Sequence, residues 1–279
     1  MLRNSHRLSG IPFCERAAKP GRETGRYTFA LRPMVIAVPM LRSSFVAASP
    51  SIRVFRVMEV TVKAQKNIEF DLLRNAKDSL RQAVELIATK DIGSHHARLK
   101  HAIIASAHCI ELLLKERLRR IDPKFVWKHI NKYANLKART VTVDEAISRL
   151  KSLGNVQFSA NDERNLKSLR TTRNAIEHYE WVTSETEAKI IVGHALSFAF
   201  GFAHDELGVD LSDEFKSDDT WAMLLNEMYE FTKAHSSRLE ARFLANGEYP
   251  SCCDECGELT VPMRGGSCEL CGHWQSVEE

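Results

Sequence analysis

The sequence lacks the signatures of several large enzyme classes. It contains no glycine-rich phosphate loop, no nucleophile elbow and no paired carboxylates at catalytic spacing. No apolar run reaches the roughly 20 residues of a transmembrane helix. No segment before residue 250 alternates apolar and polar side chains over a useful length, as a half-buried strand would. These absences argue against nucleotide-binding loops and serine hydrolases, and they predict a soluble, all-α protein with no membrane partner.

Positive charge is also scarce outside the N-terminus. The formal net charge is +3, but residues 1–57 alone carry ten Lys and Arg against two acidic residues. The remaining residues carry 29 Lys and Arg against 34 Asp and Glu. The folded body is therefore mildly acidic, and no global basic patch indicates nucleic-acid binding. Any site for RNA must be local.

The first 57 residues show no steady periodicity and contain five prolines. Their Arg-rich, nearly acid-free composition predicts a disordered tail or a misannotated N-terminal extension, with Met58 as the alternative start. An organellar transit peptide has a similar composition. The apolar run from Met34 to Met40 is too short for a secretory signal or a membrane span.

Apolar residues then recur at helical spacing over most of the chain. Thr142, Ser159 and Ser184 stand at positions typical of helix N-caps, and Thr142 has capping-box spacing with Glu145. We therefore predict an up-and-down helical bundle over residues 58–247. Its expected helices cover approximately residues 62–90, 95–120, 142–153, 159–178, 184–202 and 218–245, with a short helix or ordered loop at 125–133.

Four of the seven cysteines form two C-x-x-C pairs near the C-terminus, Cys253 with Cys256 and Cys268 with Cys271. A glycine follows each pair, and glycine permits the positive φ that a tight knuckle needs. Four thiolates can surround Zn²⁺ tetrahedrally without leaving a position for water, so we predict a structural zinc ribbon over residues 250–275. The adjacent Cys252 leaves open a shift of the first pair by one residue. The cysteine distribution favours a reducing, cytoplasmic location.

Residues 173 to 178 read Arg-Asn-Ala-Ile-Glu-His. Arg173 can neutralise a scissile phosphate, and His178 can move a proton to or from a ribose 2′-OH or the leaving oxygen. Asn174 can position the phosphate or orient the histidine. Arg173 and His178 diverge by roughly 140° on a regular helix, so they converge only near a helix end, across a bend or with help from a second subunit. The alternative is a solvated helix face on which Arg173 pairs with Glu177.

Three further polar residues share one face of the helix expected at 95–120: His101, His108 and Glu111. They have the residue types of metal ligands, but polar groups inside a bundle are commonly hydrogen-bonded core residues. Glu111 is also a candidate to orient Arg173 from the facing helix.

The apolar helix that includes residues 109–118, followed about 60 residues later by residues 169–179, resembles the HEPN superfamily. Members of this superfamily are helical bundles whose signature is an arginine, usually followed by a polar residue, with a histidine four to six residues further on. Arg173, Asn174 and His178 match that signature, and the resemblance covers approximately residues 60–210. It implies a metal-independent endoribonuclease that acts on RNA in toxin–antitoxin, phage-defence or RNA-processing systems. It further implies a homodimer whose two motifs face one composite cleft, with an antitoxin or another protein as a partner.

One position departs from that pattern. HEPN toxins that are silenced by a nucleotidyltransferase antitoxin often carry a tyrosine two residues after the histidine. Here Glu180 holds that position and Tyr179 is adjacent, so control by tyrosine modification does not follow. Some HEPN domains have lost catalysis. The alternative function is therefore a non-catalytic dimerisation module with a zinc ribbon that recruits a partner protein or nucleic acid.

Overall fold

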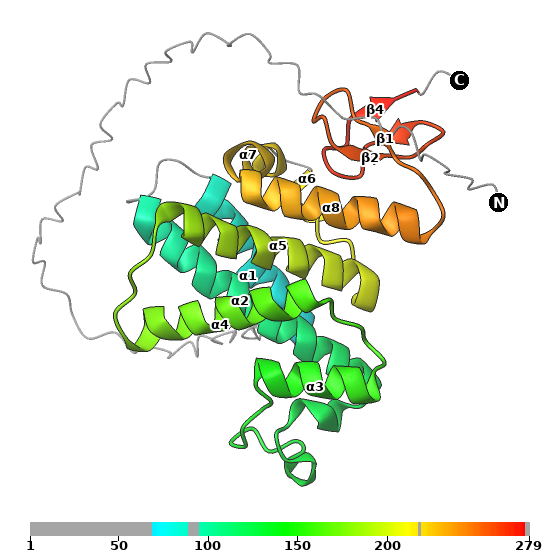
Figure 1. Cartoon of the computed structure of the whole chain (residues 1–279). Coiled ribbons are helices and arrows are strands. Elements are labelled where there is room, and N and C mark those ends of the chain that lie inside the picture. Colours follow the sequence, from blue (N-terminus) through cyan, green and yellow to red (C-terminus); the bar gives the residue numbers. More distant parts are fainter. Residues whose placement is uncertain (1–68, 89–94, 217–218, 277–279) are drawn as a thin grey trace, which may run out of the picture. The chain divides into compact units, whose positions relative to one another are not determined.

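The structure, a computed structural model, describes residues 69–88, 95–216 and 219–276, all of which belong to one compact unit. Within these residues the chain is mostly helical, with a small C-terminal part that holds four clustered cysteines (Figure 1). The expected all-α class is confirmed at this level, whereas the tail expected at 1–57 lies outside the described residues. The α-helices are α1 Leu72–Ala88, α2 His95–Ile121, α3 Val143–Leu153, α4 Ala160–His178, α5 Glu185–Leu207, α6 Asp213–Lys216, α7 Thr220–Glu227 and α8 Tyr229–Ala245.

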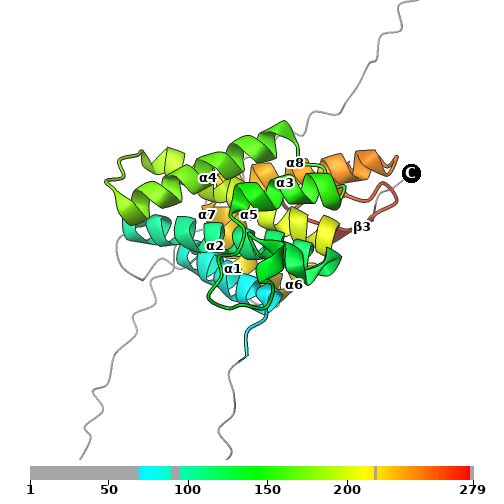
Figure 2. The ribbon, with the colours of Figure 1, turned by 90° about the horizontal axis from the view of Figure 1, so that it is seen from below.

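Helix α2 lies at the centre of the packing. It contacts α1, α4 and α5, and α5 in turn contacts α8. Figure 2 shows α2 between α1 and α4. Leu113, Leu114 and Leu118 of α2 and Leu196 of α5 are completely buried. Helix α5 is apolar around most of its circumference, as expected of a helix that is covered on several sides.

Helix α4 lies closer to the surface and has only two buried residues, Leu166 and Leu169. Its first turn is fixed to α8 by an ion pair in which Arg238 Nη2 lies 2.6 Å from Asp162 Oδ1. The two leucines anchor one face of α4 in the core. The opposite face, including its last turn, remains open to solvent.

The expected N-caps are confirmed. Thr142 and Glu145 form a complete capping box, and Ser159 and Ser184 each accept a backbone N–H from three residues ahead. The backbone N–H of Thr142 donates to the carboxylate of Glu145 and, with Lys128, lowers the pKa of Glu145 to about 2.

Two expected helix boundaries were wrong. Helix α1 begins at Leu72 instead of near residue 62, and residues before 69 lie outside the described part of the chain. The single helix expected over 218–245 is broken at Met228, whose φ of −120° and ψ of 77° are not helical. In one straight helix Trp221 and Phe231 would lie about 15 Å apart along the axis. Their ring centroids are instead 5.7 Å apart, so the chain turns at Met228 to bring both rings into the core.

The C-terminal part consists of two short antiparallel hairpins. Strand β1 (Ser251–Cys252) pairs with β2 (Leu259–Val261), and β3 (Gly266–Ser267) pairs with β4 (Trp274–Gln275). We call residues 250–275 the ribbon. The two strands between the cysteine pairs, β2 and β3, do not pair with each other, and each hairpin instead encloses one cysteine pair between its strands.

Buried contacts join the ribbon to α7 and α8. Trp221 Nε1 donates a hydrogen bond of 2.7 Å to the carbonyl oxygen of Leu270, and both residues are buried. Lys233 donates to both carboxylate oxygens of Glu258 at 2.8 and 3.1 Å, and the Ser236 hydroxyl donates to the same carboxylate at 3.0 Å. The ribbon is therefore packed onto the helices by hydrogen bonds as well as by apolar contact.

Gly193 of α5 allows a close approach to α8. A Cβ atom at this position would lie 2.7 Å from the backbone nitrogen of Phe231.

No helix among the described residues is both long and apolar enough to cross a lipid bilayer.

Candidate functional site

The last turn of α4 carries the three residues of the sequence motif. The helix ends at His178, and Tyr179 continues in an extended conformation with φ −141° and ψ −166°. The side chains of Arg173 and His178 are 39% and 65% exposed. Asn174 is exposed, and its side chain makes no hydrogen bond to the described residues. The motif is therefore open to solvent at a helix end, which is one of the three situations in which Arg173 and His178 can converge.

One carboxylate oxygen joins the two ionisable residues of the motif. Arg173 Nε lies 2.7 Å from Glu177 Oε2, and His178 Nε2 lies 4.0 Å from the same oxygen. The pairing of Arg173 with Glu177 was the alternative interpretation of the sequence, and it is present. The position of His178 beside the same oxygen was not anticipated from helical geometry. A single negatively charged oxygen can thus approach the guanidinium and the imidazole together.

Helix α2 does not orient the motif as the sequence suggested. Glu111 accepts a hydrogen bond of 2.5 Å from Lys115 instead of contacting Arg173. His108 Nδ1 lies 2.9 Å from the hydroxyl of Ser79 on α1, but His101 and His108 are both exposed, so the expectation that they are core residues was wrong. Among the described residues, neither His101, His108 nor Glu111 belongs to a cluster that can hold a metal ion.

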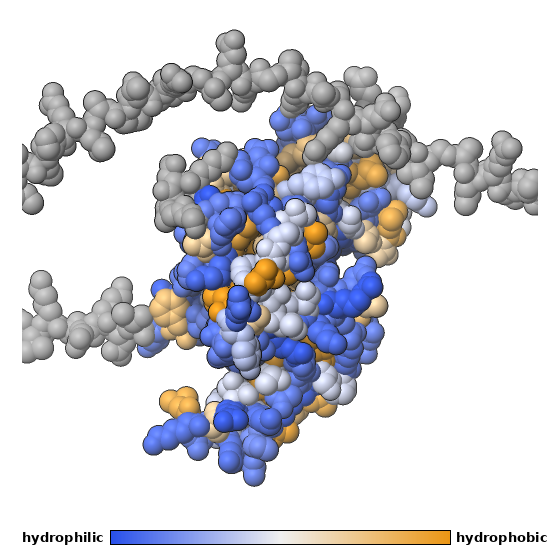
Figure 3. Space-filling view, turned by 60° about the vertical axis from the view of Figure 1, so that its left-hand side comes forward, coloured by the Kyte–Doolittle hydropathy of each residue, from blue (hydrophilic) through white to orange (hydrophobic). Residues whose placement is uncertain are grey.

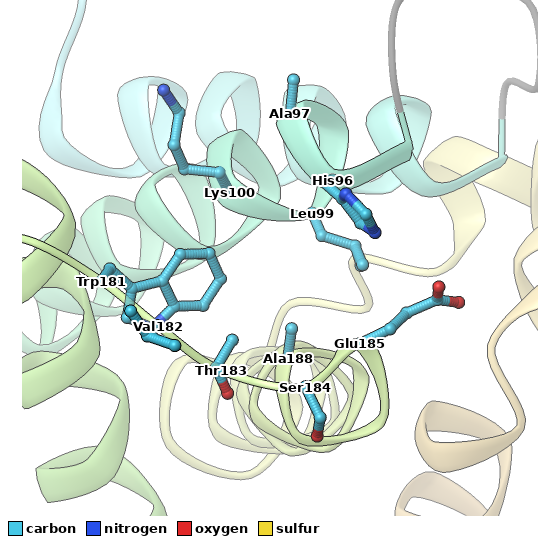
Figure 4. Close-up of a pocket in the computed structure, with 10 residues that line it drawn as sticks. All are labelled: His96, Ala97, Leu99, Lys100, Trp181, Val182, Thr183, Ser184, Glu185 and Ala188. Atoms are coloured by element: carbon cyan, nitrogen blue, oxygen red, sulfur yellow. The ribbon is translucent and has the colours of Figure 1, made fainter.

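A pocket of about 420 Å³ lies beside the segment that connects α4 to α5 (Figure 4). Its walls come from Trp181, Val182 and Thr183 on this segment and from His96 and Lys100 on α2. The lining is mainly apolar. Tyr179 and Val182 are 81% and 85% exposed. Figure 3 shows this side of the molecule as largely hydrophilic, with scattered apolar side chains. Trp181 stands three residues after His178, so the pocket lies close to the motif along the chain.

The four cysteines predicted as ligands form one cluster. Their sulfur atoms all lie within 4.8 Å of one another and can hold a metal ion. Cys253 Sγ is 3.6 Å from Cys271 Sγ, and Cys256 Sγ is 3.8 Å from Cys268 Sγ. These separations are much longer than the roughly 2.05 Å of a disulfide. Tetrahedral thiolates at about 2.3 Å from a metal would be about 3.8 Å apart.

The register of the first cysteine pair is settled by this cluster, which contains Cys253 and not the adjacent Cys252. The two glycines that follow the pairs, Gly257 and Gly272, have φ of 71° and 79°, as expected for tight knuckles. Their backbone N–H groups donate to the carbonyl oxygens of Cys253 and Cys268.

Two donors other than the cysteine thiols lie against Cys268 and lower the pKa of its thiol. The backbone N–H of Cys271 donates to Cys268 Sγ at 3.4 Å. The hydroxyl of the buried Thr260 lies 2.9 Å from Cys268 Sγ and contributes in the same direction. Neighbouring groups that hold a ligand sulfur as a thiolate are the usual surroundings of a structural metal site.

Comparison with family models, curated proteins and solved structures gives no match.

Sequence reasoning missed a buried histidine on α8. His235 is 5% exposed, stacks on Phe231 with ring centroids 5.2 Å apart and has no hydrogen-bond partner for Nδ1. Burial, with the nearby Arg238 and Arg242, lowers its pKa to about 3. It lines a polar cavity of about 220 Å³ near the ribbon. A lone histidine among apolar residues carries no sequence signal that distinguishes this environment from the surface.

Proposed function

We propose that this protein is a metal-independent endoribonuclease of the HEPN type, with Arg173 and His178 as catalytic residues. The supporting observation is that Arg173 Nε and His178 Nε2 both lie within 4.0 Å of Glu177 Oε2. We infer that this carboxylate oxygen occupies the position of a non-bridging phosphate oxygen of the substrate. Exposure of the whole motif at the end of α4 leaves room for a polynucleotide.

In this proposal the ribose 2′-oxygen attacks the neighbouring phosphorus, and the bond from phosphorus to the 5′-oxygen breaks. The products are a 2′,3′-cyclic phosphate and a free 5′-hydroxyl. Arg173 stabilises the charge that develops on the equatorial oxygens, because a guanidinium remains protonated at all relevant pH values. His178 accepts the proton of the 2′-hydroxyl or donates a proton to the leaving 5′-oxygen. Asn174 contacts the phosphate.

One imidazole performs only one of the two proton transfers at a time. We therefore propose that the protein acts as a homodimer in which the motif of a second copy supplies the other transfer. Exposed apolar side chains beside the motif, Tyr179 and Val182, favour such an arrangement, because burial of apolar surface stabilises association.

We further propose that the four-cysteine cluster holds structural Zn²⁺. The separations of the sulfur atoms fit a tetrahedral thiolate site, and four protein ligands leave no position for water. The ion would stabilise the ribbon and take no part in RNA cleavage. Purified protein is expected to contain about one zinc per chain by elemental analysis. The variant Cys268→Ser should lose most of that zinc, and wild-type content in this variant would contradict the assignment.

The decisive experiment incubates purified protein with total RNA, with and without EDTA. The wild type should cleave RNA in both conditions and leave 2′,3′-cyclic phosphate ends. His178→Ala and Arg173→Ala should each lower the rate by about 100-fold or more. The matched control is His101→Ala, which removes an exposed histidine of α2 and should cleave like the wild type.

Equal inactivity of the wild type and of His178→Ala would favour the alternative function. The bundle would then be a non-catalytic dimerisation module, and the ribbon would recruit a partner protein or nucleic acid. Cleavage that EDTA abolishes would contradict the metal-independent mechanism.

The role given to Glu177 has its own test. In Glu177→Gln the amide has no negative charge to compete with a phosphate for Arg173. Because exposed ion pairs contribute about 0.2–1 kcal/mol, RNA affinity should rise by up to about fivefold. Fluorescence anisotropy with the additional change His178→Ala measures binding without cleavage. Weaker binding in Glu177→Gln would show that the carboxylate does not occupy the phosphate position.

A further inference from the structure

The segment between α2 and α3 is strongly basic. We call residues 123–141 the basic arm. It contains no Asp or Glu, although the chain after residue 57 carries more acidic than basic residues. Figure 1 shows the arm as the looped segment that projects below α3. Its five cationic residues are Lys124, Lys128, Lys132, Lys137 and Arg139.

Most of this charge is not neutralised. Lys128 Nζ lies 3.1 Å from Glu145 Oε1 at the start of α3. Within the described residues, the other four cations of the arm form no ion pair, and all four are exposed. In the rest of the described chain, many lysines and arginines are paired with carboxylates, as Lys77 is with Glu214. The arm therefore presents a local positive potential that a polyanion would reduce.

Aromatic and apolar side chains accompany the charges. Tyr133 is 46% exposed, and its ring meets that of Trp127 edge to face, with centroids 5.2 Å apart and an interplanar angle of 82°. Ile130 and Leu136 are 45% and 95% exposed. Edge contact with Trp127 restrains the Tyr133 ring while its exposed fraction remains available for stacking. Cations interleaved with aromatic rings are typical of sites that bind single-stranded nucleic acid.

The arm is held in one shape and contains two short 3-10 helices, Pro123–Val126 and Ile130–Lys132. Arg149 of α3 donates 2.7 Å hydrogen bonds to the carbonyl oxygens of Phe125 and Trp127, and one of 2.8 Å to that of Lys128. Trp127 Nε1 donates to the carbonyl of Asn135 at 3.2 Å. These bonds fix the arm before any ligand binds, which lowers the entropic cost of binding.

Helix α3, which directly follows the arm, is connected by an ion pair to α4, the helix that carries the motif. Asp144, in the first turn of α3, forms an ion pair with Arg170 of α4. Arg173 lies about one turn further along α4. A polynucleotide that contacts the arm can therefore continue along α4 toward its last turn.

We propose that the basic arm binds single-stranded RNA, with its four unpaired cations contacting phosphates and Tyr133 stacking on a base. This inference rests on the proposed function, because it assigns the substrate-binding element of the same site. It favours RNA over an acidic protein, because the exposed ring of Tyr133 can stack on a base while the unpaired cations around it contact phosphates.

The test measures binding of a fluorescein-labelled, 20-nucleotide single-stranded RNA by anisotropy, with all proteins carrying His178→Ala. The arm variant combines Lys132→Gln, Lys137→Gln and Arg139→Gln. The matched control variant combines Lys77→Gln, Lys216→Gln and Arg264→Gln, which change the net charge equally but lie on α1, on α6 and in the ribbon, outside the arm and α4. Circular dichroism checks that both variants fold.

The arm variant should bind about 10- to 100-fold more weakly, and the slope of log Kd against log salt should fall by about 2, because each lost phosphate contact removes about 0.7. Tyr133→Ala should weaken binding by about fivefold or more, and Tyr133→Phe should retain it. Equal losses in the arm and control variants would overturn the proposal, because charge anywhere on the surface would then suffice.

The same proteins distinguish other ligands. Duplex RNA of equal length should bind more weakly than the single strand, because its bases are not free to stack on Tyr133. Arm-dependent binding to vesicles of anionic lipid with unchanged RNA binding would assign the arm to a membrane surface and overturn the proposal. Arm-dependent RNA binding by a wild type that does not cleave RNA would preserve the arm and refute only the catalytic function.

Discussion

Replacing Trp221 by phenylalanine probes how firmly the ribbon is joined to the helices. The change removes the buried hydrogen bond of 2.7 Å from Trp221 Nε1 to the carbonyl of Leu270. A buried carbonyl without a partner costs about 1–3 kcal/mol, and the smaller ring adds roughly 1 kcal/mol for the cavity. The phenyl ring retains most contacts with Phe200 and Phe231. We expect a loss of about 2–4 kcal/mol in the free energy of unfolding.

Leu270 lies between Cys268 and Cys271, so the loss should also weaken metal binding. If 2 kcal/mol of this loss comes from weaker docking of the ribbon, the equilibrium for transfer of the metal to a colorimetric chelator should shift about 30-fold toward release. The control is Trp127→Phe, whose indole donates a 3.2 Å hydrogen bond in an exposed loop and should cost less than about 1 kcal/mol. Trp221→Phe that unfolds in urea and releases metal like Trp127→Phe would refute the proposed coupling.

Two further predictions concern α5 and α8. His235 has a pKa of about 3 in the folded protein against 6.5 as its ordinary value, because burial opposes its charge. Its contribution to stability is therefore complete above pH 6.5 and is lost as the pH falls toward 3, by up to about 5 kcal/mol. His235→Phe should remove this part of the pH dependence in urea titrations. Gly193→Ala should cost about 1–3 kcal/mol, because the new Cβ would meet backbone atoms of α8. Gly201→Ala should cost less, because it meets the flexible side chain of Arg238.

Each of these two predictions has a clear contrary outcome. A pH profile of His235→Phe that parallels the wild type between pH 6.5 and 3 would mean that His235 becomes protonated without unfolding the core. Greater loss of stability in Gly201→Ala than in Gly193→Ala would mean that α8 yields more easily than the ion-paired Arg238.

Short-range signals in the sequence predicted local structure well. Thr142, Ser159 and Ser184 cap their helices as expected, because an N-cap depends only on residues two or three positions away. The break at Met228 was not predictable, since neither proline nor glycine marks it and the apolar periodicity continues through it. It results from tertiary packing, which brings Trp221 and Phe231 together across the turn.

The candidate sites were predictable to different degrees. The cysteine cluster followed from spacing, because two knuckles and four identical ligands leave few geometries. For Arg173 and His178, ideal helix angles indicated divergence, but long side chains at a helix end reach the same oxygen of Glu177. The unpaired charge of the basic arm was not evident, because the sequence does not show which lysines have acidic partners. Only the coordinates separate Lys128, which is paired with Glu145, from the other cations of the arm.

The three hydrogen bonds from Arg149 also affect how the binding enthalpy of a ligand of the arm should change with temperature. A loop that is already ordered gains little further order when a ligand arrives, so little heat should be exchanged through folding of the loop. The substitution Arg149→Met would remove these three hydrogen bonds and leave all five cations of the arm in place. Affinity should then fall mainly through an unfavourable entropy, a change that calorimetry separates from the loss of charge.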